Sequence, residues 1–167
     1  MKPIINRVAK SSLVNIDLED FYPKGKRVSI DIASWLYKGQ ILKEKQFRTL
    51  VSEHNWAAYN NNYVVLYCST QAIIPSWAYL LITSQLVGYA KLIVVGNLEL
   101  LEVTIFTEII NKIDFNIYKN KSVIIKGCAK KPIPSSAFTM LINKLQPVVK
   151  SLMYGEACSA VPIFKKK

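Results

Sequence analysis

Apolar and polar positions alternate with two different periods along the chain. Short apolar runs bounded by polar turn residues predict strands, and longer segments with apolar residues three or four positions apart predict helices. The expected strands cover residues 13–18, 28–32, 63–68, 92–95, 122–128 and 148–154, and the expected helices cover residues 41–54, 75–88, 98–113 and 134–146. This alternation predicts right-handed crossovers and a parallel sheet.

A repeat with an offset of 59 residues organises this pattern. Residues 54–96 and 113–155 align without gaps, and each copy contains two apolar runs separated by a Pro-Ser pair and an amphipathic stretch. Identical positions include Tyr59/Tyr118, Asn61/Asn120, Val64/Val123, Pro75/Pro134, Ser76/Ser135, Ala78/Ala137, Leu86/Leu145, Lys91/Lys150 and Gly96/Gly155. The repeat predicts a three-layer α/β fold with a mostly parallel sheet, helices on both faces and a short N-terminal edge strand.

Length and composition set further bounds. A chain of 167 residues fits one domain, which is expected to cover residues 1–167. Because 51% of the residues are hydrophobic and 20% are charged, the composition excludes a disordered chain. No apolar run approaches the roughly 20 residues that a membrane-spanning helix needs. The N-terminal residues lack the apolar core of a signal peptide, so we expect a cytoplasmic protein without a membrane association.

The net charge of +11 comes mainly from lysine, since only Arg7, Arg27 and Arg48 are arginines. Lysine attracts polyanions but lacks the planar fork that recognises phosphate or guanine edges. We therefore expect at most loose, salt-sensitive anion or nucleic-acid binding through surface lysines, and nucleic acid is not the expected partner.

The three cysteines, Cys68, Cys128 and Cys158, are odd in number and far apart, which indicates reduced thiols. Cys68 and Cys128 end expected strands and Cys158 follows one, and ligands of an open parallel sheet collect at the carboxyl ends of its strands. Asp31 and Glu156 are expected at the same edge. These five residues form the candidate thiol and ligand cluster.

Three interpretations of the cysteines stay open. The favoured one is that they are small apolar residues that fill space at strand ends. The alternatives are a reactive thiol and a metal site in which the three cysteines bind zinc or an iron–sulfur cluster. Polar residues after the same strands and at the following helix are candidates for binding an anion, namely Ser69, Thr70, Lys130, Lys131 and Ser135.

Several enzyme classes lack their signatures. The sole histidine, His54, is expected at the opposite edge of the sheet from the cysteines, so Cys-His and Ser-His-Asp catalysis have no supporting geometry. Neither a dinucleotide-binding nor a P-loop glycine motif is present. No enzyme class is identified, and a non-catalytic role is favoured.

Four phrases carry a resemblance to a known family: Ile-Leu-Lys-Glu-Lys (41–45), Ile-Lys-Gly-Cys (125–128), Pro-Val-Val-Lys-Ser (147–151) and Tyr-Gly-Glu-Ala-Cys-Ser-Ala-Val-Pro (154–162). The chain resembles, over almost its whole length, a bacterial family catalogued as a domain of unknown function (number 2480). That family is often encoded beside iron–sulfur cluster assembly genes, so the resemblance implies an accessory protein with thiols. Ala157 stands where the family leads us to expect proline.

These observations lead to three hypotheses. The first is a cytoplasmic accessory protein, expected to be dimeric, whose cysteines handle sulfur, a metal or a partner protein's thiol. The second is a non-catalytic homodimeric scaffold that uses the apolar helix 98–113 as its interface. The third is weak anion or nucleic-acid binding through the lysines.

Overall fold

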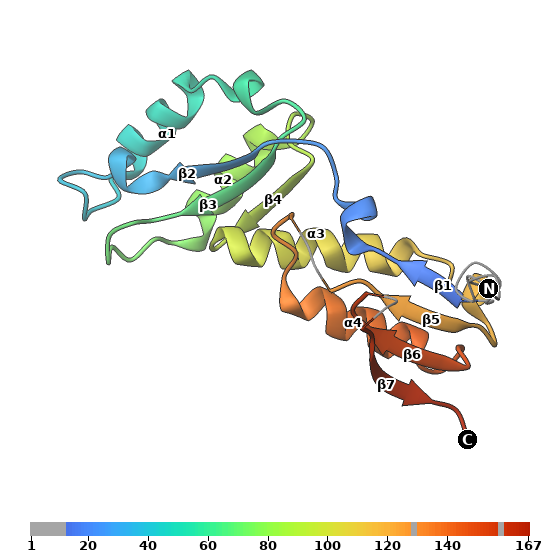
Figure 1. Cartoon of the computed structure of the whole chain (residues 1–167). Coiled ribbons are helices and arrows are strands. Elements are labelled where there is room, and N and C mark those ends of the chain that lie inside the picture. The colour runs from blue at the N-terminus through green and yellow to red at the C-terminus, as the bar shows by residue number, and fades with distance from the viewer. Residues whose placement is uncertain (1–12, 128–129, 157–158) are drawn as a thin grey trace, which may run out of the picture. The chain divides into compact units, whose positions relative to one another are not determined.

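The computed structural model describes residues 13–127, 130–156 and 159–167 of the chain (Figure 1). Its strands are β1 (Leu13–Ile16), β2 (Arg27–Asp31), β3 (Tyr63–Tyr67), β4 (Leu92–Val95), β5 (Ser122–Ile125), β6 (Ser151–Tyr154) and β7 (Val161–Lys165). Its α-helices are α1 (Glu44–Glu53), α2 (Ser76–Leu86), α3 (Leu98–Lys112) and α4 (Ser135–Leu145). Short 3₁₀ helices cover Leu18–Phe21, Ile32–Trp35, Trp56–Tyr59 and Phe115–Tyr118. The expected α/β fold with mostly parallel strands is confirmed.

The chain divides into two compact units, each with its own sheet. The central unit spans Lys24–Ile105, and the terminal unit combines Met1–Pro23 with Phe106–Lys167. The central sheet has the strand order β2-β3-β4, and the terminal sheet has the order β1-β5-β6-β7. The strands therefore form two sheets where the sequence suggested one, and the expectation of a single domain over residues 1–167 stays a prediction.

The internal repeat is confirmed in the secondary structure. The offset of 59 residues that relates the two sequence copies also relates β3 to β5, α2 to α4 and β4 to β6. Backbone hydrogen bonds repeat with it: the amide of Asn61 donates to Tyr89 O over 2.9 Å, and the amide of Asn120 donates to Val148 O over 2.8 Å. Each copy is a βαβ unit whose two strands are parallel neighbours.

The structural repeat extends further than the sequence repeat. Arg27 of β2 pairs with Tyr63 of β3, and Leu13 of β1 pairs with Ser122 of β5, so β1 and β2 occupy equivalent places. An aspartate caps a 3₁₀ helix at the end of each strand: Asp17 directly follows β1, and Asp31 is the last residue of β2. Each unit thus consists of one added strand beside a βαβ unit.

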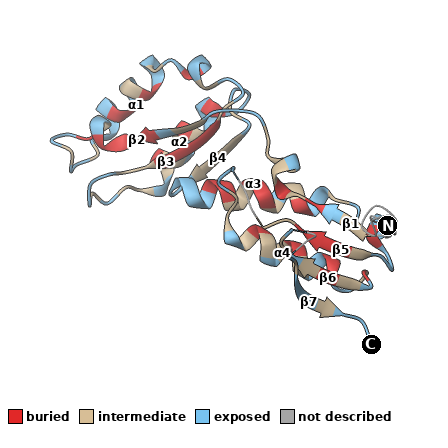
Figure 2. Cartoon of the chain, viewed as in Figure 1, coloured by how far each residue is buried: buried red, intermediate tan, exposed pale blue. Residues whose placement is uncertain are grey.

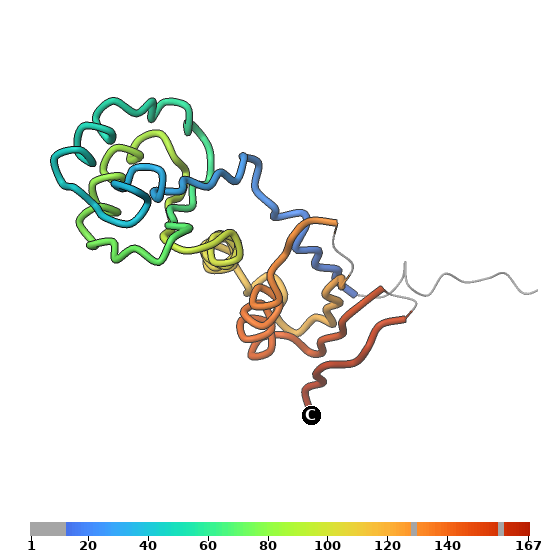
Figure 3. The backbone as a smooth tube through the Cα atoms, turned by 90° about the vertical axis from the view of Figure 1, so that its left-hand side faces the viewer, coloured from blue at the N-terminus to red at the C-terminus, as the bar shows by residue number. Residues whose placement is uncertain are grey.

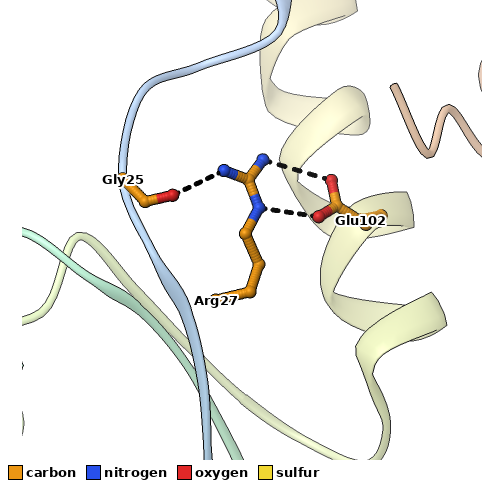
Figure 4. A network of polar contacts seen from close by, with 3 residues as sticks. All are labelled: Gly25, Arg27 and Glu102. Atoms are coloured by element: carbon orange, nitrogen blue, oxygen red, sulfur yellow. Dashed lines mark hydrogen bonds and ion pairs between the residues drawn. The ribbon is translucent and has the colours of Figure 1, made fainter. Parts of the chain in front are cut away.

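The central unit has three layers. Ile30, Val64 and Leu66 share one face of the central sheet and pack in one core with α1 and α2 (Figure 2). Arg27 and Tyr63 are on the other face, where the Arg27 Nε atom lies 2.7 Å from the Glu102 Oε1 atom of α3 (Figure 4). This unit therefore has helices on both faces of its sheet, as expected.

The terminal unit packs α4 against its sheet. Figure 3 follows its repeat copy in orange and red through β5, α4 and β6. The core is formed by apolar residues from β1, α3, β5, α4 and β6, which include Ile16, Phe106, Ile110, Val123, Ile125, Leu141, Leu145 and Leu152. Strand β7, for which the sequence pattern predicted no element, is an antiparallel edge strand paired with β6.

Two further expectations can be compared with the described residues. The first long helix begins at Glu44, three positions after the expected residue 41, because residues 37–41 form a hairpin closed by a bridge between Tyr37 and Ile41. Among the described residues, no helix has the length and apolar character needed to cross a membrane.

Candidate functional site

Asp31 lies at the carboxyl end of β2 and holds two loops of the central unit together. Its Oδ1 atom accepts hydrogen bonds from the amide of Ala33 over 2.9 Å and from the amide of Ser69 over 3.0 Å. Burial acts to raise the pKa of Asp31, but hydrogen bonds from the Ser69 side chain and from these two amides lower it below its ordinary value. Asp31 is therefore an ionised carboxylate that fixes the position of the loop after β3.

Cys68 begins this loop, directly after β3. The Cys68 side chain is half-buried, and its Sγ atom lies 3.3 Å from the Oγ1 atom of Thr70. Burial raises the pKa of Tyr79 in α2, and an electrostatic interaction with Cys68 raises it further. The thiol thus contacts Thr70 and interacts with a residue of α2.

A pocket of about 830 Å³ opens beside Thr70. One side is the hairpin around Lys38 and Gly39, and the other is the loop from Thr70 to Pro75 with the start of α2. Lys38 and Gly39 have φ angles of 51° and 67°, so both adopt the left-handed conformation at the centre of a β-turn in which the amide of Gln40 donates to Tyr37 O over 3.2 Å. Its lining residues are Lys38, Gly39, Gln40, Ile41, Leu42, Glu44, Thr70, Gln71, Ala72, Ile73, Pro75 and Trp77.

The rim of this pocket exposes apolar side chains. Ile73 is 93% exposed and Ile41 is 56% exposed, whereas isoleucine is normally among the most buried residues. The side-chain amides of Gln40 and Gln71 lie in the same lining. The pocket therefore offers apolar contacts and hydrogen-bonding groups side by side.

The predicted site residues separate between the two sheets. Asp31, Cys68, Ser69 and Thr70 belong to the central unit, and Glu156 follows β6 of the terminal sheet. Cys128 and Cys158 lie outside the described residues. The strand before Cys68, β3, and the strand before Cys128, β5, are in different sheets, so the expected single edge becomes one carboxyl edge for each sheet.

The predicted anion site at Lys130 and Lys131 contains a carboxylate of the protein itself. The amides of both residues donate hydrogen bonds to the Oε1 atom of Glu19. Ser135 is the first residue of α4 and is exposed, and no side chain caps this helix through Pro134. These loop amides therefore bind an anionic group, and that group is Glu19.

His54 lies at the end of α1 in an aromatic cluster. Its Nε2 atom is 2.9 Å from the hydroxyl of Tyr59, and its ring packs near Trp35 and Trp56. Burial lowers the pKa of His54. These contacts give the histidine a packing role.

The next question is which side chains could bind a metal ion. Among residues 13–127, 130–156 and 159–167, no group of three or more His, Cys, Asp or Glu side chains is placed to hold a metal ion. Cys68 and Asp31 lie at the carboxyl ends of neighbouring strands of the central sheet, and Asp31 is already hydrogen-bonded to two loops. A metal at this edge needs further ligands from elsewhere.

The hairpin side of the pocket was missed in the sequence analysis. Residues 35–39 fall between the expected strand 28–32 and the expected helix 41–54, where the sequence pattern predicted no element. The available signal was Gly39, because a lysine-glycine pair at the centre of a four-residue turn is compatible with the left-handed angles seen here. The pocket itself depends on two loops that are about 30 residues apart in sequence.

No curated protein and no solved structure matches the chain significantly. A family model matches residues 2–166, which is almost the entire chain. The chain therefore belongs to the family described as protein of unknown function (DUF2480).

Proposed function

We propose that this chain is a non-catalytic cytoplasmic accessory protein that binds an extended segment of a partner protein in the pocket beside Thr70. The observation that carries the proposal is the pocket itself, which lies at the carboxyl edge of the central sheet, where parallel sheets hold their ligands. Its volume of about 830 Å³ falls within the range of ligand sites.

The chemistry of the lining supports a polypeptide occupant. The amides of Gln40 and Gln71 can pair with both N–H and C=O groups of a peptide backbone. The exposed side chains of Ile41 and Ile73 offer contacts for apolar side chains of the same segment. Lys38 and Glu44 line the pocket with opposite charges, which does not favour a strongly charged ligand.

The thiol of Cys68 gives this pocket its link to sulfur or metal handling. Its Sγ atom contacts Thr70, which lines the pocket, so a bound partner segment would lie near a cysteine. One thiol does not complete a zinc or iron–sulfur site, since such sites use three or four protein ligands. We therefore propose that any metal or thiol carried here is shared with the partner.

A random peptide library displayed on phage tests the binding. We expect the protein to enrich a common apolar-containing motif, and Ile73→Asp to weaken binding of the selected peptide at least about tenfold because it places a charge at the rim. Leu80→Asp is the matched control, since Leu80 is 67% exposed on α2 and does not line the pocket. Failure to enrich a motif, or equal losses in both variants, contradicts the proposal.

Elemental analysis and thiol titration of the protein purified together with its bound partner, under reducing, anaerobic conditions, test the metal component. Zinc or iron that is lost in Cys68→Ser supports a shared metal at this pocket. Protein without metal, or metal retained in Cys68→Ser, contradicts that component and leaves the peptide test unaffected.

A homodimeric scaffold is the second candidate. It is favoured by the apolar side chains of Val95, Leu98 and Leu100, which are 46%, 49% and 44% exposed where β4 leads into α3. Light scattering at high concentration checks it: a dimer that Leu98→Asp converts to a monomer supports this candidate, and a monomeric wild-type protein excludes it.

A further inference from the structure

Lysines stand in a row at the amino edge of the terminal sheet. Lys121 directly precedes β5, Lys150 directly precedes β6, and Lys166 directly follows the antiparallel strand β7. The amide of Lys150 donates to Lys121 O over 2.8 Å, and the amide of Lys166 donates to Lys150 O over 2.9 Å. The three lysines therefore occupy neighbouring chain segments about 5 Å apart, and all three are exposed.

Further lysines surround this row. Lys144 lies in the last turn of α4, and Lys166 lines a hollow of about 440 Å³ together with Asn143 and Gln146 from the end of that helix. Lys119 lies in the turn that leads into Lys121, and Lys165 and Lys167 flank Lys166. We call this set the basic edge; its members are Lys119, Lys121, Lys144, Lys150, Lys165, Lys166 and Lys167.

Carboxylates of the terminal unit are found mainly at the other end of the sheet. Asp17, Glu19 and Asp20 follow β1, and Glu156 follows β6. There the Lys126 Nζ atom lies 3.2 Å from the Asp17 Oδ2 atom, and Glu19 accepts from two loop amides. Near the basic edge, Asp114 accepts hydrogen bonds from Asn116. In the part of the chain that the structure describes, no ion pair neutralises a lysine of the basic edge.

We infer that the basic edge binds the phosphate backbone of a nucleic acid, loosely and without sequence preference. Lysine ammonium groups bind phosphates as point charges, and a line of them across neighbouring strands suits a line of phosphates. Polar groups lie between the lysines: the hydroxyls of Ser122 and Ser151 are 2.9 Å apart at the start of β5 and β6. Such hydroxyls can contact phosphate oxygens, and phosphates that follow one another along a single strand match lysines that follow one another across neighbouring strands, which favours a nucleic acid.

The central unit lacks this arrangement although it has the same fold. Asn62 occupies the position equivalent to Lys121. Lys91, the equivalent of Lys150, donates to Lys24 O over 2.8 Å, and its Nζ atom lies 5.6 Å from the centre of the Tyr63 ring. The inference therefore assigns binding to the terminal unit, and it does not depend on the pocket of the central unit.

Fluorescence anisotropy with a labelled oligo-dT strand of about 20 nucleotides tests the inference. Each phosphate contact contributes about −0.7 to the slope of log K against log salt for single strands, so three contacts predict a slope near −2. The double variant Lys121→Glu/Lys150→Glu is expected to bind at least about tenfold more weakly at about 50 mM salt and to reduce the slope by about 1.4.

The matched control is Lys26→Glu/Lys45→Glu, which makes the same change in net charge at exposed positions of the central unit. We expect this control to keep the affinity and the slope nearly unchanged, with far-UV circular dichroism showing that both double variants are folded. Three results overturn the inference: an affinity that is flat between about 50 and 200 mM salt, equal losses in both double variants, or binding of phosphatidylserine vesicles through Lys121 and Lys150 without binding of the oligonucleotide.

Discussion

The best-defined polar interaction of a single pair of side chains is the Arg27–Glu102 ion pair (Figure 4). The Nε and Nη2 atoms of Arg27 donate to the two carboxylate oxygens of Glu102 over 2.7 and 3.3 Å, and Nη1 donates to Gly25 O over 2.8 Å. The two side chains are only 15% and 9% exposed. Their contribution to stability is therefore set by the cost of leaving either charge unpaired away from water.

Replacing Glu102 by Gln should destabilise the protein. The substitution keeps the shape of the side chain but removes the carboxylate charge that pairs with the guanidinium of Arg27. We expect the free energy of unfolding to fall by about 2–3 kcal/mol, somewhat less than for a fully buried pair. Urea denaturation of the two proteins measures this difference.

The control for this prediction is the ion pair between Glu44 and Arg48 on α1. Their side chains are 63% and 54% exposed, although the atoms are only 2.9 Å apart. Glu44→Gln should change stability by no more than about 0.5 kcal/mol, because water and salt screen exposed pairs. Equal losses in Glu102→Gln and Glu44→Gln would show that the low exposure of Glu102 has no energetic consequence.

The individual site residues were partly predictable. Sequence analysis placed Asp31, Ser69 and Thr70 together because strand ends are recognisable from local patterns, and they do meet at one edge. It did not predict that Asp31 would use its carboxylate to hold the amides of Ala33 and Ser69. Such a role depends on the distance between two loops, which the sequence pattern does not contain.

At the scale of elements, the repeat imposes the same turn on both copies. Asn61 and Asn120 have φ angles of 60° and 59°, in the left-handed region that disfavours most side chains. Asparagine tolerates this conformation better than other residues with a Cβ atom. The identity of these two positions in the sequence therefore has a conformational cause.

Alanine at either position should destabilise its turn by about 1 kcal/mol, whereas glycine should be neutral or stabilising by a similar amount. The two copies should respond alike, because the amide of each asparagine makes an equivalent backbone hydrogen bond. Denaturation curves of Asn61→Ala, Asn61→Gly, Asn120→Ala and Asn120→Gly provide the comparison. A loss of stability with glycine as large as with alanine would indicate that the side-chain amide matters more than the backbone angle.

The repeat was predictable because identical residues in the two copies align without gaps and so determine the offset. The strands and helices of the two copies are related by the same offset. The equivalence of β1 and β2 was not predictable, because the identities Val14/Val28, Ile16/Ile30 and Asp17/Asp31 span only four residues, which is too short to establish a repeat. Their relation is visible only from the pairing of each with the first strand of a repeat copy.

At the scale of the whole molecule, local patterns do not determine which strands pair. β4 and β5 are successive along the chain, yet they belong to different sheets because the 15-residue helix α3 separates them. A helix of that length carries the chain about 22 Å. The prediction of one shared edge for all three cysteines assumed one sheet, and the pairing of β5 with β1 removes that assumption.

Helix α3 also suggests how the two units respond to unfolding. The helix is continuous across the boundary between them, with Leu101 and Ile105 on one side and Phe106 and Ile110 on the other, all buried. Loss of either core removes the packing of half of this helix, and helices in proteins depend mainly on such packing. We therefore expect a single cooperative transition, in agreement with the predicted single domain.

The distribution of tryptophan makes this expectation testable. All three tryptophans, Trp35, Trp56 and Trp77, lie in the central unit, so their fluorescence reports the unfolding of that unit. Leu141 is fully buried in the core of the terminal unit. Leu141→Ala should cost about 3 kcal/mol and, if the units unfold together, should lower the urea midpoint seen by tryptophan by about 1–2 M.

Ile82→Ala is the matched control, because Ile82 is the repeat equivalent of Leu141 and is fully buried in the central core. Both variants should shift the fluorescence transition by similar amounts, and far-UV circular dichroism should give the same midpoint as fluorescence. If Leu141→Ala instead leaves the tryptophan transition in place and produces an earlier step in circular dichroism, the units are separate domains. The continuity of α3 would then connect them without making their unfolding cooperative, because each half of the helix would depend only on its own core.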